Sequence, residues 1–166
     1  MSTSTVNCDR TGYVEETLYD SGIDWYAEYN KLISMSKRDL LAQSNVIIGK
    51  FPNAHCYTKR MTEHLLSSNN IKGIPIVILR PSILGAALNE PVPGWIDTTS
   101  FMAGVTLLVG HGILTQIPCK QDAFVDIIPV DYVVKQIFLS IPFLVKSHRE
   151  SGGKNNFFIT SCSTSS

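Results

Sequence analysis

Apolar residues recur at helical spacing in two neighbouring segments within residues 24–49. The first segment follows Asp24 and places apolar side chains three or four positions apart, at Trp25, Tyr29, Leu32 and Ile33. The second segment follows Ser36, which lies three positions before Asp39, the spacing of a capping box. Because Gly49 can adopt the left-handed conformation that ends helices, we expect two short helices, with the second ending there.

A third helical segment leads into a buried strand. Pro52 and Asn53 form a start signal for a helix that runs to about Ser68, with Asn53 at the cap position. Residues 74–79 then read Ile-Pro-Ile-Val-Ile-Leu, a continuous apolar run of strand length. Since such runs are typical of parallel strands covered on both faces, we expect half of a βαβ unit here.

The rest of the chain alternates loops with further expected elements. Residues 80–82 and 90–95 are rich in proline and glycine, and long loops at the carboxyl end of a strand commonly touch a ligand. The expected elements are a core helix over residues 99–109 that ends at Gly110, a helix from Tyr132 to about Ser140 with Asp131 as its cap, and a strand over residues 156–160. Near the start, the β-branched residues within 3–7 predict a short strand end.

These elements place the chain in the α/β class. Helices that alternate with buried strands predict a Rossmann-like parallel sheet, with about three strands in this chain. The composition agrees, because 44% of the 166 residues are apolar and only 17% are charged, against a norm of roughly 25%. We therefore expect residues 1–166 to form one packed domain.

Charge and hydropathy exclude several classes of partner. The 14 basic residues balance the 14 acidic ones, so the chain carries no surplus of positive charge for nucleic acid or an anionic membrane. The longest apolar stretches, residues 101–110 and 137–145, are about half the roughly 20 residues that a transmembrane helix needs. We expect no nucleic-acid partner and no transmembrane segment in this chain.

Searches for local motifs exclude several kinds of site. The four cysteines lie 48, 63 and 43 positions apart, which fits neither a metal site nor a dense disulfide framework. We expect free thiols in a reducing compartment and no metal. No glycine-rich turn follows a strand, and no tyrosine lies four positions before a lysine. The residue four positions before Lys59 is His55.

The segment around Lys59 nevertheless carries a family resemblance. Residues 51–59 read Phe-Pro-Asn-Ala-His-Cys-Tyr-Thr-Lys and resemble the Pro-Asn-Thr-Tyr-x-Tyr-Thr-Lys stretch of alcohol-forming fatty acyl-CoA reductases. Four other segments resemble further blocks of that family in the same order: residues 2–7, 77–86, 90–97 and 126–131. The resemblance implies a partial reductase domain, the carboxyl half of an NAD(P)-binding Rossmann-like domain truncated at its N-terminus.

The resemblance also implies a reaction and a set of site residues. These enzymes are extended short-chain dehydrogenase relatives that use NADPH to reduce a fatty acyl-CoA to an aldehyde and then to a primary alcohol. Thr3, with Ser2 beside it, falls on the hydroxyl that polarises the substrate carbonyl, and Lys59 falls on the lysine that orients the nicotinamide ribose. The cofactor-lining loop falls on three residues after the buried strand: Pro81, Ser82 and Gly85.

One departure from the family pattern leaves two functions open. His55 stands where the family has its proton-donating tyrosine, and the like charge of Lys59 one turn away disfavours a protonated imidazole. The glycine-rich turn that would hold the NADPH pyrophosphate is also absent. We therefore expect the chain to be either part of an active reductase or a catalytically silent fragment or interaction module. The resemblance also implies association with the peroxisomal or endoplasmic reticulum membrane.

The apolar strand 74–79 is expected to have an exposed edge, which predicts self-association.

Overall fold

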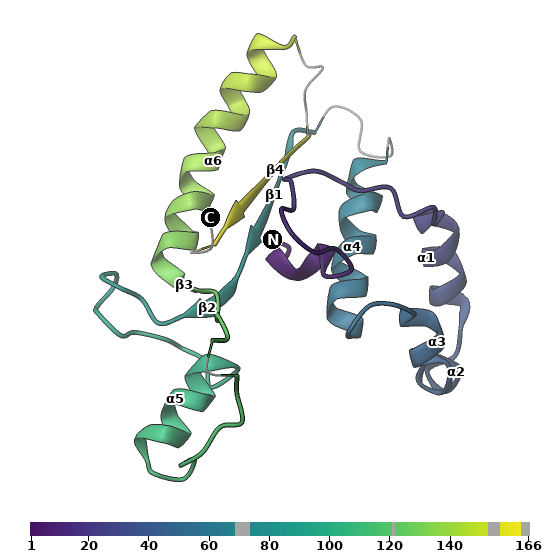
Figure 1. Ribbon diagram of the computed structural model, residues 1–166. Helices are drawn as coiled ribbons and strands as arrows, with labels where there is room; N and C mark the ends of the chain where they lie inside the picture. The colour runs from purple at the N-terminus through teal and green to yellow at the C-terminus, as the bar shows by residue number, and fades with distance from the viewer. Residues whose placement is uncertain (69–73, 121, 153–156, 164–166) are drawn as a thin grey trace.

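The computed structural model of the protein describes residues 1–68, 74–120, 122–152 and 157–163. Within these residues the elements before β1 are all helical, and strands and helices follow one another in the rest of the chain (Figure 1). In chain order they are η1 (Ser4–Asn7), α1 (Trp25–Ser34), α2 (Lys37–Ala42), α3 (Ser44–Ile48), α4 (Ala54–Ser67), β1 (Ile76–Pro81), β2 (Ile83–Gly85), α5 (Met102–Gly110), β3 (Ile127–Pro129), α6 (Val130–Glu150) and β4 (Phe157–Cys162).

The described strands pair in parallel, which confirms the α/β class. Strand β1 pairs with β4, so that Ile76 lies opposite Phe157, and β2 pairs with β3, so that Ile83 lies opposite Ile127. Helix α6 runs along one face of the β1–β4 pair, whereas η1 and α4 lie on the other (Figure 1). The apolar run expected at residues 74–79 is the strand β1, displaced by two residues. The short strand β2 was not expected.

The start of the chain turns into a 3₁₀ helix, so the prediction of a strand end over residues 3–7 was wrong. The Oγ1 of Thr3 accepts a hydrogen bond from the N–H of Thr5, and η1 begins immediately after Thr3. Such local hydroxyl bonds compete with sheet pairing. Only Ser2 reaches the sheet, where its N–H donates to the carbonyl of Leu79 at 2.7 Å.

Helices α1 to α3 form a layer beside α4. The carboxylate of Asp24 caps α1, and the Oγ of Ser36 caps α2 by accepting the N–H of Asp39, whose carboxylate accepts the hydroxyl of Ser36 and not its N–H as in a capping box. The second expected helix is interrupted at Gln43 and forms α2 and α3 separately, with Gly49 at the end of α3. The core between this layer and α4 consists of Trp25, Tyr57 and Met61, against which Leu32, Ile47, Ile48, Phe51 and Leu65 pack.

Two expectations for the second half of the chain were wrong. Helix α5 is not a core helix, because Ala103 is its one buried residue whereas Leu107 is 48% exposed. Its sequence is apolar all round and lacks an amphipathic pattern that would direct one face inward. Helix α6 continues past Ser140 to Glu150. It contains Pro142, which has no N–H to donate to the helix backbone.

Asp131 does not cap α6 and instead holds a distant loop. Its buried carboxylate accepts hydrogen bonds from the backbone N–H groups of Leu88, Asn89 and Glu90 at 3.0, 3.1 and 3.4 Å. These bonds lower the pKa of Asp131, with the bond from Leu88 contributing most. The carboxylate therefore fixes the loop after β2 against the start of α6.

The stability of the protein should depend on the ionisation of Asp131. A pKa lowered by folding gives stability that is present above the unfolded pKa, near about pH 4, and is lost as the pH falls through the folded pKa. Urea unfolding from about pH 7 down to about pH 3 should show this loss. Asp131→Asn should be less stable near neutral pH and lack this part of the acid dependence. Exposed Asp97→Asn is the control, and equal behaviour of the two variants would contradict this role.

Candidate functional site

The predicted site residues of the two halves meet where η1 lies against the first turns of α4. Lys59, in the second turn of α4, donates from Nζ to the backbone carbonyl of Met1 at 3.1 Å. One turn earlier, the Sγ of Cys56 lies 3.4 Å from the Oγ1 of Thr5. The structure therefore brings the lysine and the hydroxyl-bearing segment Ser2–Thr3 together, although they are more than 50 positions apart.

The two predicted hydroxyls, of Ser2 and Thr3, differ in their hydrogen bonds. The Oγ1 of Thr3 lies 3.0 Å from the Oγ1 of Thr5 and accepts the N–H of the same residue. The Oγ of Ser2 is buried and has no hydrogen-bond partner within the described part of the chain. Since a buried hydroxyl without a partner is costly, Ser2 is the hydroxyl available to an incoming polar group.

His55 lies in the first turn of α4, directly after the N-terminal boundary that Asn53 sets. The Oδ1 of Asn53 accepts the N–H of Cys56 at 2.9 Å, as the sequence predicts for an N-cap. The His55 side chain is exposed and that of Lys59 is half-buried. Residues four apart lie on the same helix face, so His55 faces the same junction as Lys59.

Pro81, Ser82 and Gly85 lie at the end of β1 and in β2. Pro81 and Ser82 are buried, and the N–H of Ser82 donates to the carbonyl of Cys162 at 2.9 Å. Like Ser2, Ser82 has a buried Oγ with no partner within residues 1–68, 74–120, 122–152 and 157–163. Two buried hydroxyls without partners among the described residues leave capacity for hydrogen bonds with an incoming polar group.

The opposite face of α4 is occupied by structural contacts. Tyr57 is buried, and its hydroxyl donates to the Oε1 of Glu28 at 3.0 Å, so the residue packs α4 against α1. Burial, followed by the bond to Glu28 and its charge, raises the pKa of Tyr57. A phenol whose ionisation is suppressed in this way cannot replace the tyrosine missing at position 55.

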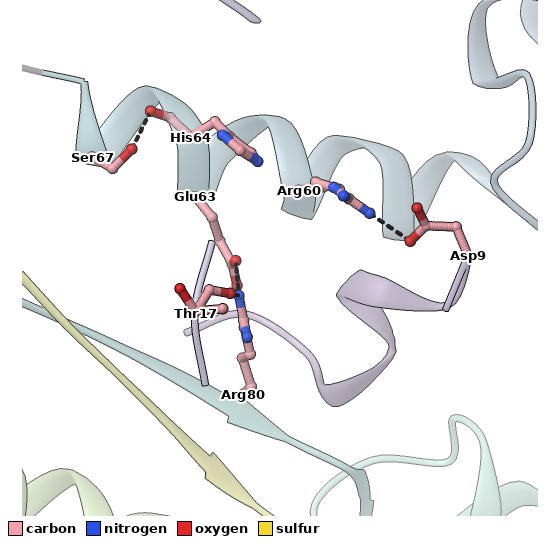
Figure 2. Close-up of polar contacts among 7 residues, drawn as sticks. All are labelled: Asp9, Thr17, Arg60, Glu63, His64, Ser67 and Arg80. Carbon is pink, nitrogen blue, oxygen red and sulfur yellow. Dashed lines mark hydrogen bonds and ion pairs between the residues drawn. The ribbon is translucent and has the colours of Figure 1, made fainter. Parts of the chain in front are cut away.

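Sequence reasoning missed a set of ion pairs that hold α4 in place. Arg80 of β1 donates from Nε and Nη2 to the two carboxylate oxygens of Glu63 on α4, at 3.0 and 2.7 Å, and Nη2 also donates to the carbonyl of Thr17 (Figure 2). Arg60, on the same helix, pairs with Asp9. No local pattern identifies such partners, because 17 positions separate Glu63 from Arg80 and 51 separate Asp9 from Arg60.

A cavity of about 530 Å³ lies beside the structural face of α4. Its walls carry both signs of charge and two aromatic rings, and its lining includes Asp9, Glu28, Lys50, Phe51, Tyr57 and Arg60. None of the residues predicted to be catalytic or to bind the cofactor lines it. The cavity is therefore separate from the candidate site.

The described residues give no sign of two other kinds of site. No group of three or more histidine, cysteine or acidic residues within them is placed to hold a metal ion. No helix in this part of the chain has the length and apolar character needed to span a membrane. All four cysteines have free thiols, as expected from their spacing.

Comparison with known proteins identifies the family. Residues 1–137 match the model of an NAD-binding domain family described as male sterility protein. The chain belongs to this family. The match covers most of the chain and includes every predicted site residue. It confirms the family inferred from the sequence, and a family of NAD-binding domains agrees with a nicotinamide cofactor.

Curated relatives of the family carry reductase names. The chain is 36% identical to fatty acyl-CoA reductase 1 of Xenopus laevis over 134 residues, which is 81% of this chain and 26% of the relative. It is 34% identical to human fatty acyl-CoA reductase 1 over the same share, and 30% identical to human fatty acyl-CoA reductase 2 over 90% of this chain and 28% of the relative. The chain thus spans about a quarter of the length of these relatives.

Gly85 has a structural role that can be separated from a cofactor role. A Cβ at this position would lie 2.7 Å from the Cγ2 of Ile127, so Gly85→Ala should force β2 and β3 apart and cost about 1–3 kcal/mol of unfolding free energy. Gly110→Ala is the matched control, because a Cβ there meets no atom within 4 Å. Urea unfolding without cofactor measures both. Equal stability of the two variants would show that β2 does not need this close approach.

Proposed function

We propose that the chain forms the catalytic junction of an NADPH-dependent fatty acyl-CoA reductase, which reduces a long-chain acyl-CoA to a fatty alcohol through the aldehyde. The observation that carries the proposal is the bond from Lys59 Nζ to the carbonyl of Met1, at 3.1 Å. It brings the lysine of α4 to the residue that precedes Ser2 and Thr3, which supports the proposal. Family membership and the reductase names of the relatives support the same reaction.

Each residue of the junction has a proposed role. A hydroxyl of the Ser2–Thr3 pair donates a hydrogen bond to the substrate carbonyl, and the unpartnered Oγ of Ser2 is free to do so. Lys59 holds the ribose next to the nicotinamide, and Pro81, Ser82 and Gly85 line the nicotinamide side of the cofactor. When bound, NADPH supplies the hydride.

Proton delivery to the developing alkoxide is the step at which this chain departs from the family pattern. His55 is exposed on the junction face of α4, where an imidazolium can donate a proton that the solvent replaces. A second function, a catalytically silent interaction module, is favoured by this one substitution of the family tyrosine.

Restoring the tyrosine separates these two functions. The test protein is a chimaera in which this chain replaces the matching segment of the Xenopus laevis reductase, assayed by NADPH consumption with a long-chain acyl-CoA. A positioned general acid contributes roughly 100-fold to 10,000-fold, so His55→Tyr should raise kcat by that order if the imidazole is a poor donor. His111→Tyr, at another exposed histidine, is the control.

The outcomes of this experiment bear on different proposals. Measurable activity with His55, further raised by tyrosine, supports a reductase with a weakened proton donor. Activity only with tyrosine supports the silent module. No activity in either chimaera, when the intact Xenopus laevis enzyme is active, would overturn the reductase proposal for this chain.

We also propose that the chain self-associates through apolar surface beside its open sheet. Ile78 of β1 is buried, so the strand expected to be exposed is partly covered. Exposed apolar residues also lie on α6, where Leu139 is 70% and Phe143 is 57% exposed beside an apolar groove of about 340 Å³. Sedimentation velocity should show oligomers that Leu139→Glu reduces. A monomer that melts cooperatively in calorimetry would contradict this expectation.

A further inference from the structure

Two cysteines meet at the junction between η1 and α4. Cys8 follows η1, and its N–H donates to the carbonyl of Thr5 at 3.1 Å. Cys56 lies in the first turn of α4, with its Sγ 3.4 Å from the Oγ1 of the same threonine. Thr5 therefore contacts both cysteines, which are 48 positions apart in the chain.

Cys56 also influences the ionisation of the Cys8 thiol. Burial raises the pKa of the Cys8 thiol, and the charge of Cys56 and a hydrogen bond with its side chain raise it further. Cys8 is exposed and Cys56 is buried. A reagent in solution thus reaches Cys8 first, and Cys56 is the cysteine that shares the contact with Thr5. The proposed reductase reaction uses neither of them.

We propose that Cys8 and Cys56 form a disulfide when a peroxide oxidises the protein, and that this bond ties η1 to α4. The Cys8 thiolate attacks one oxygen of hydrogen peroxide, breaks the O–O bond and becomes a sulfenic acid, while the other oxygen leaves as water after protonation. The Cys56 thiolate then attacks the Cys8 sulfur and displaces hydroxide, which takes up a proton. In sum, two thiols and one peroxide give one disulfide and two waters.

The position of the bond gives it a consequence for the junction. Cys56 is the residue after His55 and lies three positions before Lys59, on the turn that packs against η1. A disulfide would replace a hydroxyl–thiol contact with a covalent link at this place. The inference does not rest on the proposed reductase function, because it concerns only thiols and their contacts in this chain.

Peptide mapping of the peroxide-treated chain tests the proposal directly. Trypsin cleaves after Arg10, Lys50 and Lys59, so Cys8 and Cys56 fall in separate peptides, residues 1–10 and 51–59. At micromolar protein, the linked pair should dominate over intermolecular products, because the effective concentration within one chain is on the order of millimolar. Its rate should rise steeply with pH, because only the thiolate reacts and folding raises the pKa of Cys8.

Variants and denaturant supply the controls. Cys8→Ser should abolish the linked peptide, and because this side chain is exposed the variant should leave the fold intact. Cys119→Ser and Cys162→Ser should not reduce the linked pair. In urea the pairing preference for Cys56 should disappear. The proposal is overturned if Cys8 is oxidised to sulfinic acid while Cys56 stays reduced, or if the same mixture of pairs forms with and without urea.

Discussion

The buried ion pair between Arg80 and Glu63 determines how helix α4 lies against strand β1. Both side chains are only 3% exposed, and the guanidinium binds both carboxylate oxygens. Breaking a buried pair by removing one partner costs about 3–5 kcal/mol, since the remaining charge stays without a counter-charge. The further bond from Arg80 to the carbonyl of Thr17 ties the loop after η1 to the same point. A single arginine thus joins a strand, a helix and a loop.

The candidate site is a consequence of this docking. With α4 held against β1, its first turns face η1, and Lys59 reaches the carbonyl of Met1. The N–H of Ser2 pairs with the carbonyl of Leu79, one residue before Arg80, so the hydroxyl-bearing segment is attached to the same strand. The chemistry proposed for the chain, and the thiol pair beside it, both depend on a junction that contacts elsewhere maintain.

Local signals in the sequence predicted the elements that local physics determines. Asn53 caps α4, Ser36 caps α2, and the apolar run at residues 74–79 gives most of β1. The meeting of Lys59 with the start of the chain followed only from the family resemblance. That resemblance carried information about the tertiary structure that periodicity does not contain.

Several of the failures share a physical cause, which is competition from distant partners. Asp131 has the position of a helix cap, but three N–H groups of the loop at residues 88–90 bind its carboxylate instead. The strands β2 and β3 are too short to show a strand pattern in the sequence, and they are stabilised by pairing with each other. Glu63 stands on the same helix face as His55 and Lys59, and nothing in its surroundings along the chain indicates that an arginine on a strand would bury it.

The most direct test of the central ion pair is the change in unfolding free energy on Glu63→Gln, measured by urea denaturation. The neutral amide keeps the shape of the side chain and removes its charge, so the buried Arg80 would lose its counter-ion. The variant should lose about 3 kcal/mol or more, whereas Glu150→Gln, at the exposed pair with Lys146, should lose less than about 1 kcal/mol. Equal, small losses in both variants would contradict the account, because α4 would then be held against β1 by something other than this ion pair.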